Sequence, residues 1–190
     1  KYNWEISQPL PNQKEIIVIE NNLQPGELGK TKEHLLGYYY AQEITSMMPI
    51  LALSPKNEDI FLDCCAAPGS KTTQAAALME NKGIIIANDL SMGRISILSA
   101  NLERLGITNT IITLHDFLQL SNKLKELNMK FSKILVDAPC SGEGNIRLSP
   151  STYLNWSEGL LKKLSSKQKR IAEAALQLLK PGREMIYSTC

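Results

Sequence analysis

Two cysteines in this sequence are placed where they could do covalent chemistry. Cys140 follows Asp137-Ala-Pro and Cys190 follows Ser188-Thr, and a short apolar run precedes each of these segments. Cysteine is the most nucleophilic side chain near neutral pH, and it is also a workable leaving group. A neighbouring acid or base could move the proton that such a reaction releases. A single cysteine at a strand end is more often a small buried hydrophobic residue, but two such sites weaken that interpretation.

A glycine-containing loop and several acids could bind a cofactor. The loop Asp63-Cys-Cys-Ala-Ala-Pro-Gly-Ser-Lys offers backbone N–H groups at a helix start, where a carboxylate or phosphate is favoured. It matches neither a dinucleotide loop nor a Walker loop. Asp89 could accept both hydroxyls of a ribose, with Arg94 beside the same sugar, and Asp116 could take the amino group of adenine. Each acid alone could be only a strand-end cap, but together they fit S-adenosylmethionine better than a nicotinamide.

The elements that must position these residues follow from apolar patterning. Residues 60–62, 83–87, 110–114, 134–136 and 185–187 predict five buried strands. Helical spacing is found over residues 37–53, 72–79 and 92–105, and in a longer stripe from Leu160 to Leu179 that we expect to end at Pro181-Gly182. Strands that alternate with helices predict a doubly wound, Rossmann-like α/β domain with a mainly parallel sheet. Its ligands should bind beyond the carboxyl ends of the strands, where the acids and cysteines lie.

Length and composition set the domain organisation. A chain of 190 residues, 43% apolar, allows one α/β domain with a core and an appended arm. Proline and glycine interrupt residues 1–36, which we interpret as an arm or domain remnant, and residues 37–190 as the catalytic domain. The chain begins without methionine and stops on a strand-like run, so we expect a domain that is incomplete at its C-terminus.

Bulk properties exclude several classes of protein. No apolar run approaches the roughly 18 to 20 residues of a membrane span, and no signal peptide opens the chain, so we expect a cytoplasmic protein that binds no membrane. The four cysteines form no Cys-x-x-Cys pair, which argues against a zinc site or a disulfide framework. A net charge of +2 permits nucleic-acid binding without arguing for it. We expect a monomer that binds no metal.

Four segments resemble the motifs of the Nop/Sun (Fmu) family of S-adenosylmethionine-dependent RNA cytosine-5 methyltransferases. They are Gly37-Tyr-Tyr-Tyr-Ala-Gln-Glu, Asp63-Cys-Cys-Ala-Ala-Pro-Gly-Ser-Lys-Thr, Asp137-Ala-Pro-Cys-Ser-Gly-Glu-Gly and Ser188-Thr-Cys. The resemblance runs from about Gly37 to Cys190, and it implies a class I methyltransferase fold. It also implies S-adenosylmethionine as cofactor and a tRNA or rRNA as substrate.

The resemblance assigns the two thiols different roles. Cytosine C5 is a poor nucleophile, so a thiolate must first add to C6 before C5 can accept a methyl group. By similarity Cys190 is this nucleophile and Cys140 assists product release, whereas Pro139-Cys140 taken alone favours Cys140 as the attacking thiol. Asp137, with Lys71 nearby, could hold N3 and N4 of the base. The candidate cofactor-binding residues are Cys65, Ala66, Ala67, Pro68, Gly69, Ser70, Lys71, Asp89, Arg94, Asp116 and Asp137.

Two other classes of function remain open. A DNA cytosine-5 methyltransferase would use Cys140 as nucleophile and would need a target-recognition domain. A non-catalytic RNA-binding or assembly protein on the same fold would be expected to lose one cysteine or Asp137. The sequence retains both cysteines and the acid, which favours an enzyme.

The chain departs from the family's pattern at two positions. Ser70 and Arg183 each stand where a second glycine is usual, and Arg183 would strain its turn if the site needed a positive φ. Other side chains have two interpretations each. The basic cluster Lys162, Lys163, Lys167, Lys169 and Arg170 predicts a solvated helix face, with RNA contact as the alternative, and Tyr153, Trp156 and Arg147 could contact RNA or only pack. We interpret Cys64 as core, and His34 and His115 as structural.

Overall fold

The structure is a computed structural model that describes all residues except 1, 146–151, 153, 155 and 190. It separates into two compact units, Lys1–Ala41 and Gln42–Cys190. The first unit contains the predicted arm. A two-stranded antiparallel pair, β1 (Ile6–Ser7) and β2 (Val18–Ile19), is followed by the short helices η1 (Leu28–Lys30) and α1 (Lys32–Leu35). Thr31 caps α1, because its hydroxyl accepts a hydrogen bond from the His34 amide.

The second unit is built on a parallel sheet of five strands in the order β5-β4-β3-β6-β7. The strands are β3 (Ile60–Asp63), β4 (Ile84–Asp89), β5 (Thr110–Leu114), β6 (Phe131–Asp137) and β7 (Leu179–Ser188). The central strands read as continuous apolar runs because helices cover both of their faces. The predicted doubly wound fold is confirmed, and the carboxyl ends of all five strands lie at one edge.

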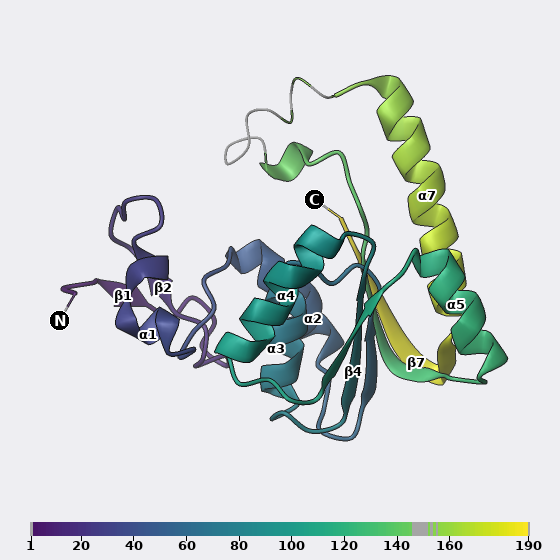
Figure 1. The fold of residues 1–190 in the computed structure, drawn as a ribbon. Coiled ribbons are helices and arrows are strands. Elements are labelled where there is room, and N and C mark those ends of the chain that lie inside the picture. Colours follow the sequence, from purple (N-terminus) through teal and green to yellow (C-terminus); the bar gives the residue numbers. More distant parts are fainter. Residues whose placement is uncertain (1, 146–151, 153, 155, 190) are drawn as a thin grey trace. The chain divides into compact units, whose positions relative to one another are not determined.

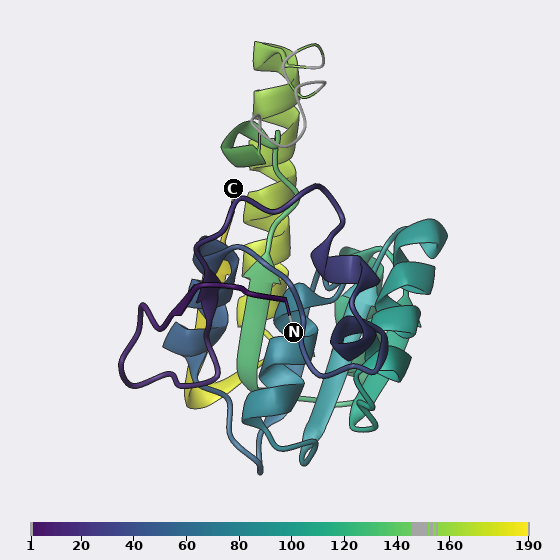
Figure 2. The same cartoon turned by 90° about the vertical axis from the view of Figure 1, so that its left-hand side faces the viewer.

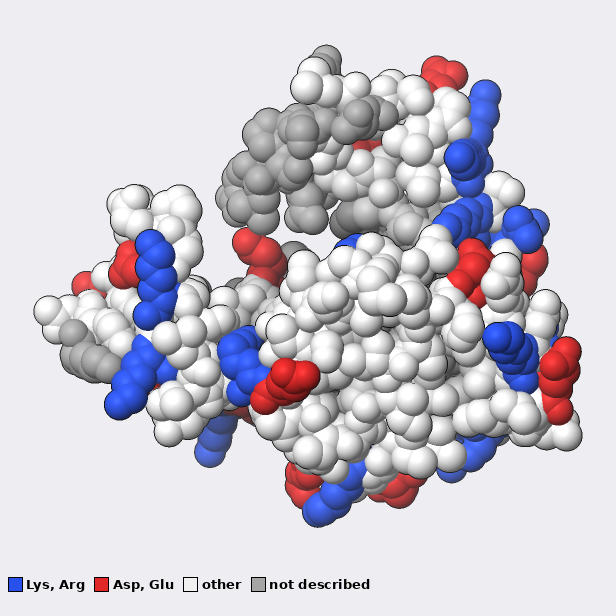
Figure 3. Space-filling view, viewed as in Figure 1, with Lys and Arg blue, Asp and Glu red and all other residues white. Residues whose placement is uncertain are grey.

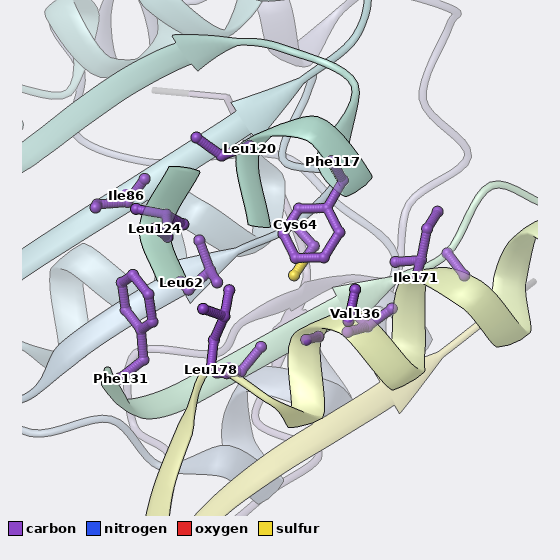
Figure 4. Packing of buried hydrophobic residues seen from close by; sticks show 14 residues of the cluster. Leu62, Cys64, Ile86, Phe117, Leu120, Leu124, Phe131, Val136, Ile171 and Leu178 are labelled. Carbon is purple, nitrogen blue, oxygen red and sulfur yellow. The ribbon is translucent and has the colours of Figure 1, made fainter. Parts of the chain in front are cut away.

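Side chains that alternate along each strand divide the core into two layers. Phe61, Ile85 and Leu135 pack against α2 (Ile44–Leu53), α3 (Ser70–Leu78) and α4 (Met92–Arg104). Leu62, Ile134 and Val136 face the other way, toward α5 (Phe117–Glu126) and α7 (Glu158–Leu176). Figure 1 shows the helices on the two sides of the sheet, and Figure 4 shows the second layer, with Cys64 buried in it as predicted.

Two observed helices, α2 and α5, differ from the prediction. Residues 37–43 are not helical, and α2 begins only at Ile44, because Gly37 adopts a φ of 78° and Glu43 an extended cap conformation. Helix α5 was not predicted at all. Asp116 starts it by accepting a hydrogen bond from the Leu118 amide at 2.9 Å, and its apolar face then packs into the core. From the sequence, Asp116 is expected to be an adenine ligand or a strand-end cap, and the helix that it starts is not predicted.

The long apolar stripe does not continue as helix to Pro181. Helix α7 ends at Leu176, and Leu179 already pairs with Phe131 in the sheet. Between that pair and the pair of Lys133 with Glu184, β7 carries extra residues that bulge out of register. Pro181, which lacks an N–H, is accommodated in this bulge. The positive φ of 71° falls on Gly182 and not on Arg183, so the departure from the family pattern at Arg183 strains nothing.

Helix α7 is long enough to reach past the sheet. Figures 1 and 2, drawn from directions 90° apart, both show its N-terminal half extending beyond the carboxyl ends of the strands. In the part of the chain that the structure describes, no helix has the length and apolar character needed to cross a membrane.

Candidate active site

A cavity of about 370 Å³ opens at the carboxyl edge of the sheet. Residues that follow β3, β4, β5 and β6 line it, together with two residues of α7. They are Cys64, Cys65, Asn88, Asp89, Leu90, Arg94, His115, Asp116, Phe117, Asp137, Ala138, Pro139, Cys140, Lys167 and Ile171. The structure thus brings together six of the predicted site residues, from four separate segments of the chain.

Asp89 is fixed in place at the end of β4. Its side chain is only 3% exposed, and it accepts hydrogen bonds from the backbone amides of Ser91 at 3.0 Å and Ala67 at 3.2 Å. The Arg94 guanidinium lies 3.3 Å from the same carboxylate and also donates to the carbonyl oxygen of Ala67. Asp89 and Arg94 therefore meet as the sequence predicted. These contacts leave lone pairs of the carboxylate for sugar hydroxyls.

The glycine loop contributes less to the cavity wall than predicted. Cys65 lines the cavity, whereas the following residues, Ala66 to Lys71, do not. Gly69 adopts a φ of 107°, and a Cβ there would lie 2.7 Å from Leu98 Cδ1. Glycine is therefore required by the turn and by the packing of α4 against it. Ser70 is the first residue of α3 and needs no such freedom.

Lys71 and Asp137 form an ion pair beside the cavity. The distance from Lys71 Nζ to Asp137 Oδ2 is 2.8 Å, and the two side chains are 14% and 34% exposed. Ser46 Oγ accepts a second hydrogen bond from Lys71 at 3.2 Å, and Ser188 Oγ donates to Asp137 Oδ1 at 2.7 Å. Two hydroxyls, from α2 and β7, therefore orient the ion pair. The sequence predicts Lys71 near Asp137, but it does not predict these two hydrogen bonds.

A second carboxyl lies beneath this pair. Asp63 is 1% exposed and accepts a hydrogen bond from the Thr72 hydroxyl at 2.8 Å. Burial raises the pKa of Asp63 to about 7, and the Asp137 carboxylate adds to the rise, while Thr72, Lys71 and the Cys65 amide oppose it. Near neutral pH, the protonated and ionised forms of the Asp63 carboxyl are therefore both populated.

The cysteines have different environments. Burial raises the pKa of Cys65 to about 12, with further contributions from Asp63, Asp89 and Asp137. Burial also raises the pKa of Cys64 well above its usual value, so neither residue is a thiolate near neutral pH. Cys140 lines the cavity. Cys190, the predicted nucleophile, lies outside the described residues.

Several cavity residues were not predicted to contribute. His115, which we interpret from the sequence as structural, lines the cavity next to Asp116, and Phe117 does so because α5 begins there. Lys167 and Ile171 come from α7, one helical turn apart. Their spacing shows only that they share a helix face, since nothing local indicates which cavity that face meets.

Other predicted contacts stay open. Tyr153 and Arg147 lie outside the described residues, and the Trp156 indole N–H donates to the Glu143 carboxylate. Among the described residues, no group of three or more His, Cys, Asp or Glu side chains could hold a metal ion.

Comparisons with known proteins place this geometry in context. The family described as 16S rRNA methyltransferase RsmB/F matches residues 50–190. Ribosomal RNA small subunit methyltransferase F of Vibrio cholerae serotype O1 is 47% identical over 165 residues, which cover 86% of this chain and 34% of that protein. The protein of the same name from Pectobacterium carotovorum is 42% identical over 192 residues, which cover 100% and 39%. The chain thus spans little more than a third of these relatives.

Solved structures agree in fold. NSun6 from Pyrococcus horikoshii, solved with SFG, has a TM-score of 0.76 at 36% identity and covers 85% of this chain and 40% of its own. A methyltransferase homologue protein from the same organism has a TM-score of 0.82 at 37% identity, with coverage of 99% and 57%.

Proposed function

Because the chain belongs to the 16S rRNA methyltransferase RsmB/F family, we propose that it carries the methyl-transfer site of an enzyme that modifies C5 of a cytosine in ribosomal RNA. The resemblance to the Nop/Sun family and the expected class, an S-adenosylmethionine-dependent methyltransferase, are confirmed by this match. The relatives' names favour small-subunit ribosomal RNA over tRNA as substrate.

One observation carries the proposal. The same cavity brings together Asp89 with Arg94, which we assign to the ribose, and Asp137 with Lys71 beside it, which we assign to the base. The residues present fit S-adenosylmethionine. Asp89 can accept ribose hydroxyls, and Asp116 uses one carboxylate oxygen for its cap while no hydrogen bond among the described residues uses the other. An adenine amino group could donate to that second oxygen.

The cofactor supplies an electrophilic methyl group, and the residues prepare the base to accept it. In the proposed reaction the Cys190 thiolate adds to C6 of cytosine, so that a C–S bond forms and electron density moves onto C5. Asp137, oriented by Lys71 and Ser188, accepts a hydrogen bond from the N4 amino group, and the Lys71 ammonium beside it stabilises the negative charge that develops toward N3. C5 then takes the methyl group.

A second cysteine would complete the reaction. After transfer, C5 carries both the methyl group and a proton, and Cys140 assists removal of that proton. The electron pair of the C5–H bond then reforms the ring double bond, and the C6–S bond breaks to release Cys190. Cys64 and Cys65 are poor candidates for either step because their raised pKa values keep them as thiols.

Trapping of the covalent intermediate tests these assignments in the complete encoded protein. Cys190→Ala should abolish methylation and all covalent capture of 16S ribosomal RNA. Cys140→Ala should accumulate a denaturant-resistant protein–RNA adduct when S-adenosylmethionine is present, because the thioether cannot eliminate. Denaturing electrophoresis reports both outcomes, and bisulfite sequencing of the RNA reports the product.

The same gel separates the alternatives. An adduct in Cys190→Ala and none in Cys140→Ala would reverse the roles of the two thiols, as in a DNA-type mechanism. Binding of 16S ribosomal RNA by the wild-type protein with neither adduct nor methylated cytosine in any variant would favour a non-catalytic RNA-binding protein.

A further inference from the structure

Helix α7 combines a wall of the cavity with a dense run of positive charge. It carries five cations, at residues 162, 163, 167, 169 and 170, against two acids, Glu158 and Glu173. Figure 3 shows Lys and Arg side chains gathered along this helix. The cations are not equivalent, because their spacing divides them between two faces.

One face carries Lys163, Lys167 and Arg170, at spacings of four and three residues. This basic ridge adjoins the apolar side of the helix, where Ile171 is buried. Lys162 and Lys169 are seven residues apart and lie together on a different face, where Lys169 Nζ is 4.0 Å from the Glu173 carboxylate. No ion pair is found for the ridge cations among the described residues.

The ridge is fixed to the site. Lys167 is half-buried and lines the cavity together with Asp137 and Cys140, while Lys163 and Arg170 are exposed on either side of it along the helix. The Gln168 side chain donates a hydrogen bond to the carbonyl oxygen of Pro139 at 2.9 Å, which ties α7 to the segment that contains Cys140. The charge is thus held at a constant position relative to the proposed reaction centre.

We propose that the ridge Lys163–Lys167–Arg170 binds the phosphate backbone of the RNA strand next to the target cytosine. The inference rests on the proposed function, because it takes RNA as the substrate. A base that enters the cavity must bring its own phosphodiesters to the rim, and Lys167 is the cation that α7 contributes to the lining. Lys163 and Arg170 extend the positive surface along α7, so that neighbouring phosphates of the same strand can contact them. Such contacts position the strand without reading its sequence.

Matched charge removal tests this assignment. The double variant Lys163→Gln/Arg170→Gln and the double variant Lys162→Gln/Lys169→Gln remove the same charge from exposed positions of one helix. Binding of 16S ribosomal RNA transcribed in vitro would be measured in the complete encoded protein over a range of salt concentrations. The ridge variant should weaken binding about tenfold or more and reduce the salt slope by about 1.4, the value for two lost phosphate contacts on a single strand. The control variant should change both much less.

Lys167→Gln is tested separately because it reaches the cavity. It should weaken RNA binding and leave the affinity for S-adenosylmethionine, measured by calorimetry, unchanged. Equal losses in the two double variants would show a general charge effect and overturn the ridge, and so would no loss in either. Loss of cofactor affinity with RNA binding intact would assign Lys167 to the cofactor instead. If the wild-type protein binds the RNA but transfers no methyl group, the proposed reaction is wrong. RNA binding by the two double variants then still tests the ridge.

Discussion

The two halves of the cavity are built in different ways. On the β4 side, Asp89 is almost fully buried, and two of its three contacts come from neighbours within five positions, Ser91 and Arg94. On the β6 side, Asp137 is one-third exposed, and its partners are remote in sequence, Lys71 by 66 residues and Ser188 by 51. The proposed cofactor half is held mainly by local contacts, with one more from the Ala67 amide, whereas the proposed base half forms only when β6, β7 and α3 have assembled.

Loss of the base half should have the largest effect. Asp137→Asn keeps the shape of the side chain but removes the charge that Lys71 and Ser188 orient, so methyl transfer should fall by up to about 10⁴-fold. Single-turnover methylation of 16S ribosomal RNA measures the rate. Ser188→Ala is the matched control, because it removes only one hydrogen bond to the same carboxylate and should cost about tenfold. Equal effects would mean that Asp137 acts only as structure.

Cys65, in the cavity wall, should be alkylated more slowly than an ordinary cysteine. With a pKa of about 12, Cys65 should react with iodoacetamide at pH 8 roughly 10³-fold more slowly than a thiol with a pKa of 9.0, because far less thiolate is present. Peptide mass spectrometry after timed alkylation gives the rate for each cysteine, and a short cysteine peptide serves as the reference. Alkylation of Cys65 as fast as the peptide would show that the carboxylates around it do not act as described.

The cofactor half should fail by loss of affinity. Asp89→Ala removes the acceptor for the ribose hydroxyls, and calorimetry should show S-adenosylmethionine bound roughly 10²-fold more weakly. Ser91→Ala provides the comparison, since the Ser91 backbone amide that contacts Asp89 is unchanged by it. Unchanged affinity in Asp89→Ala would remove this residue from the sugar site and would leave the two halves without distinct roles.

Asp63 should make the unfolding free energy of the protein depend on pH. Its folded pKa is raised from 3.8 to about 7, so the stability that it contributes is full below pH 3.8 and is lost as the pH rises through 7. Between pH 5 and pH 7 this amounts to about 2 kcal/mol of unfolding free energy. Urea unfolding of the wild type and Asp63→Asn at both values isolates the contribution. The same fall in stability in both proteins would contradict the raised pKa.

The features that could be predicted from the sequence are those that depend on local patterns. The strands, the acids that end them and the proximity of Asp89 and Arg94, both expected beside one sugar, are signalled by local patterns, so they could be predicted. Helix α5 is not predicted because Asp116 is considered as a ligand group or as the end of a strand, and not as the N-cap of a helix. The roles of Lys167 and His115 in the cavity wall, and of Ser46 behind Lys71, depend on packing between distant elements, which no local pattern encodes.

Gly69 has a consequence for how this loop can change over evolutionary time. Its φ of 107° and the 2.7 Å that a Cβ would leave to Leu98 make every other amino acid strained at this position, while Ser70 beside it begins a helix that accepts many. Substitution should therefore be tolerated at position 70 and strongly disfavoured at position 69. A library randomised at both positions and selected for folded protein should return glycine at 69 and a broad set of residues at 70.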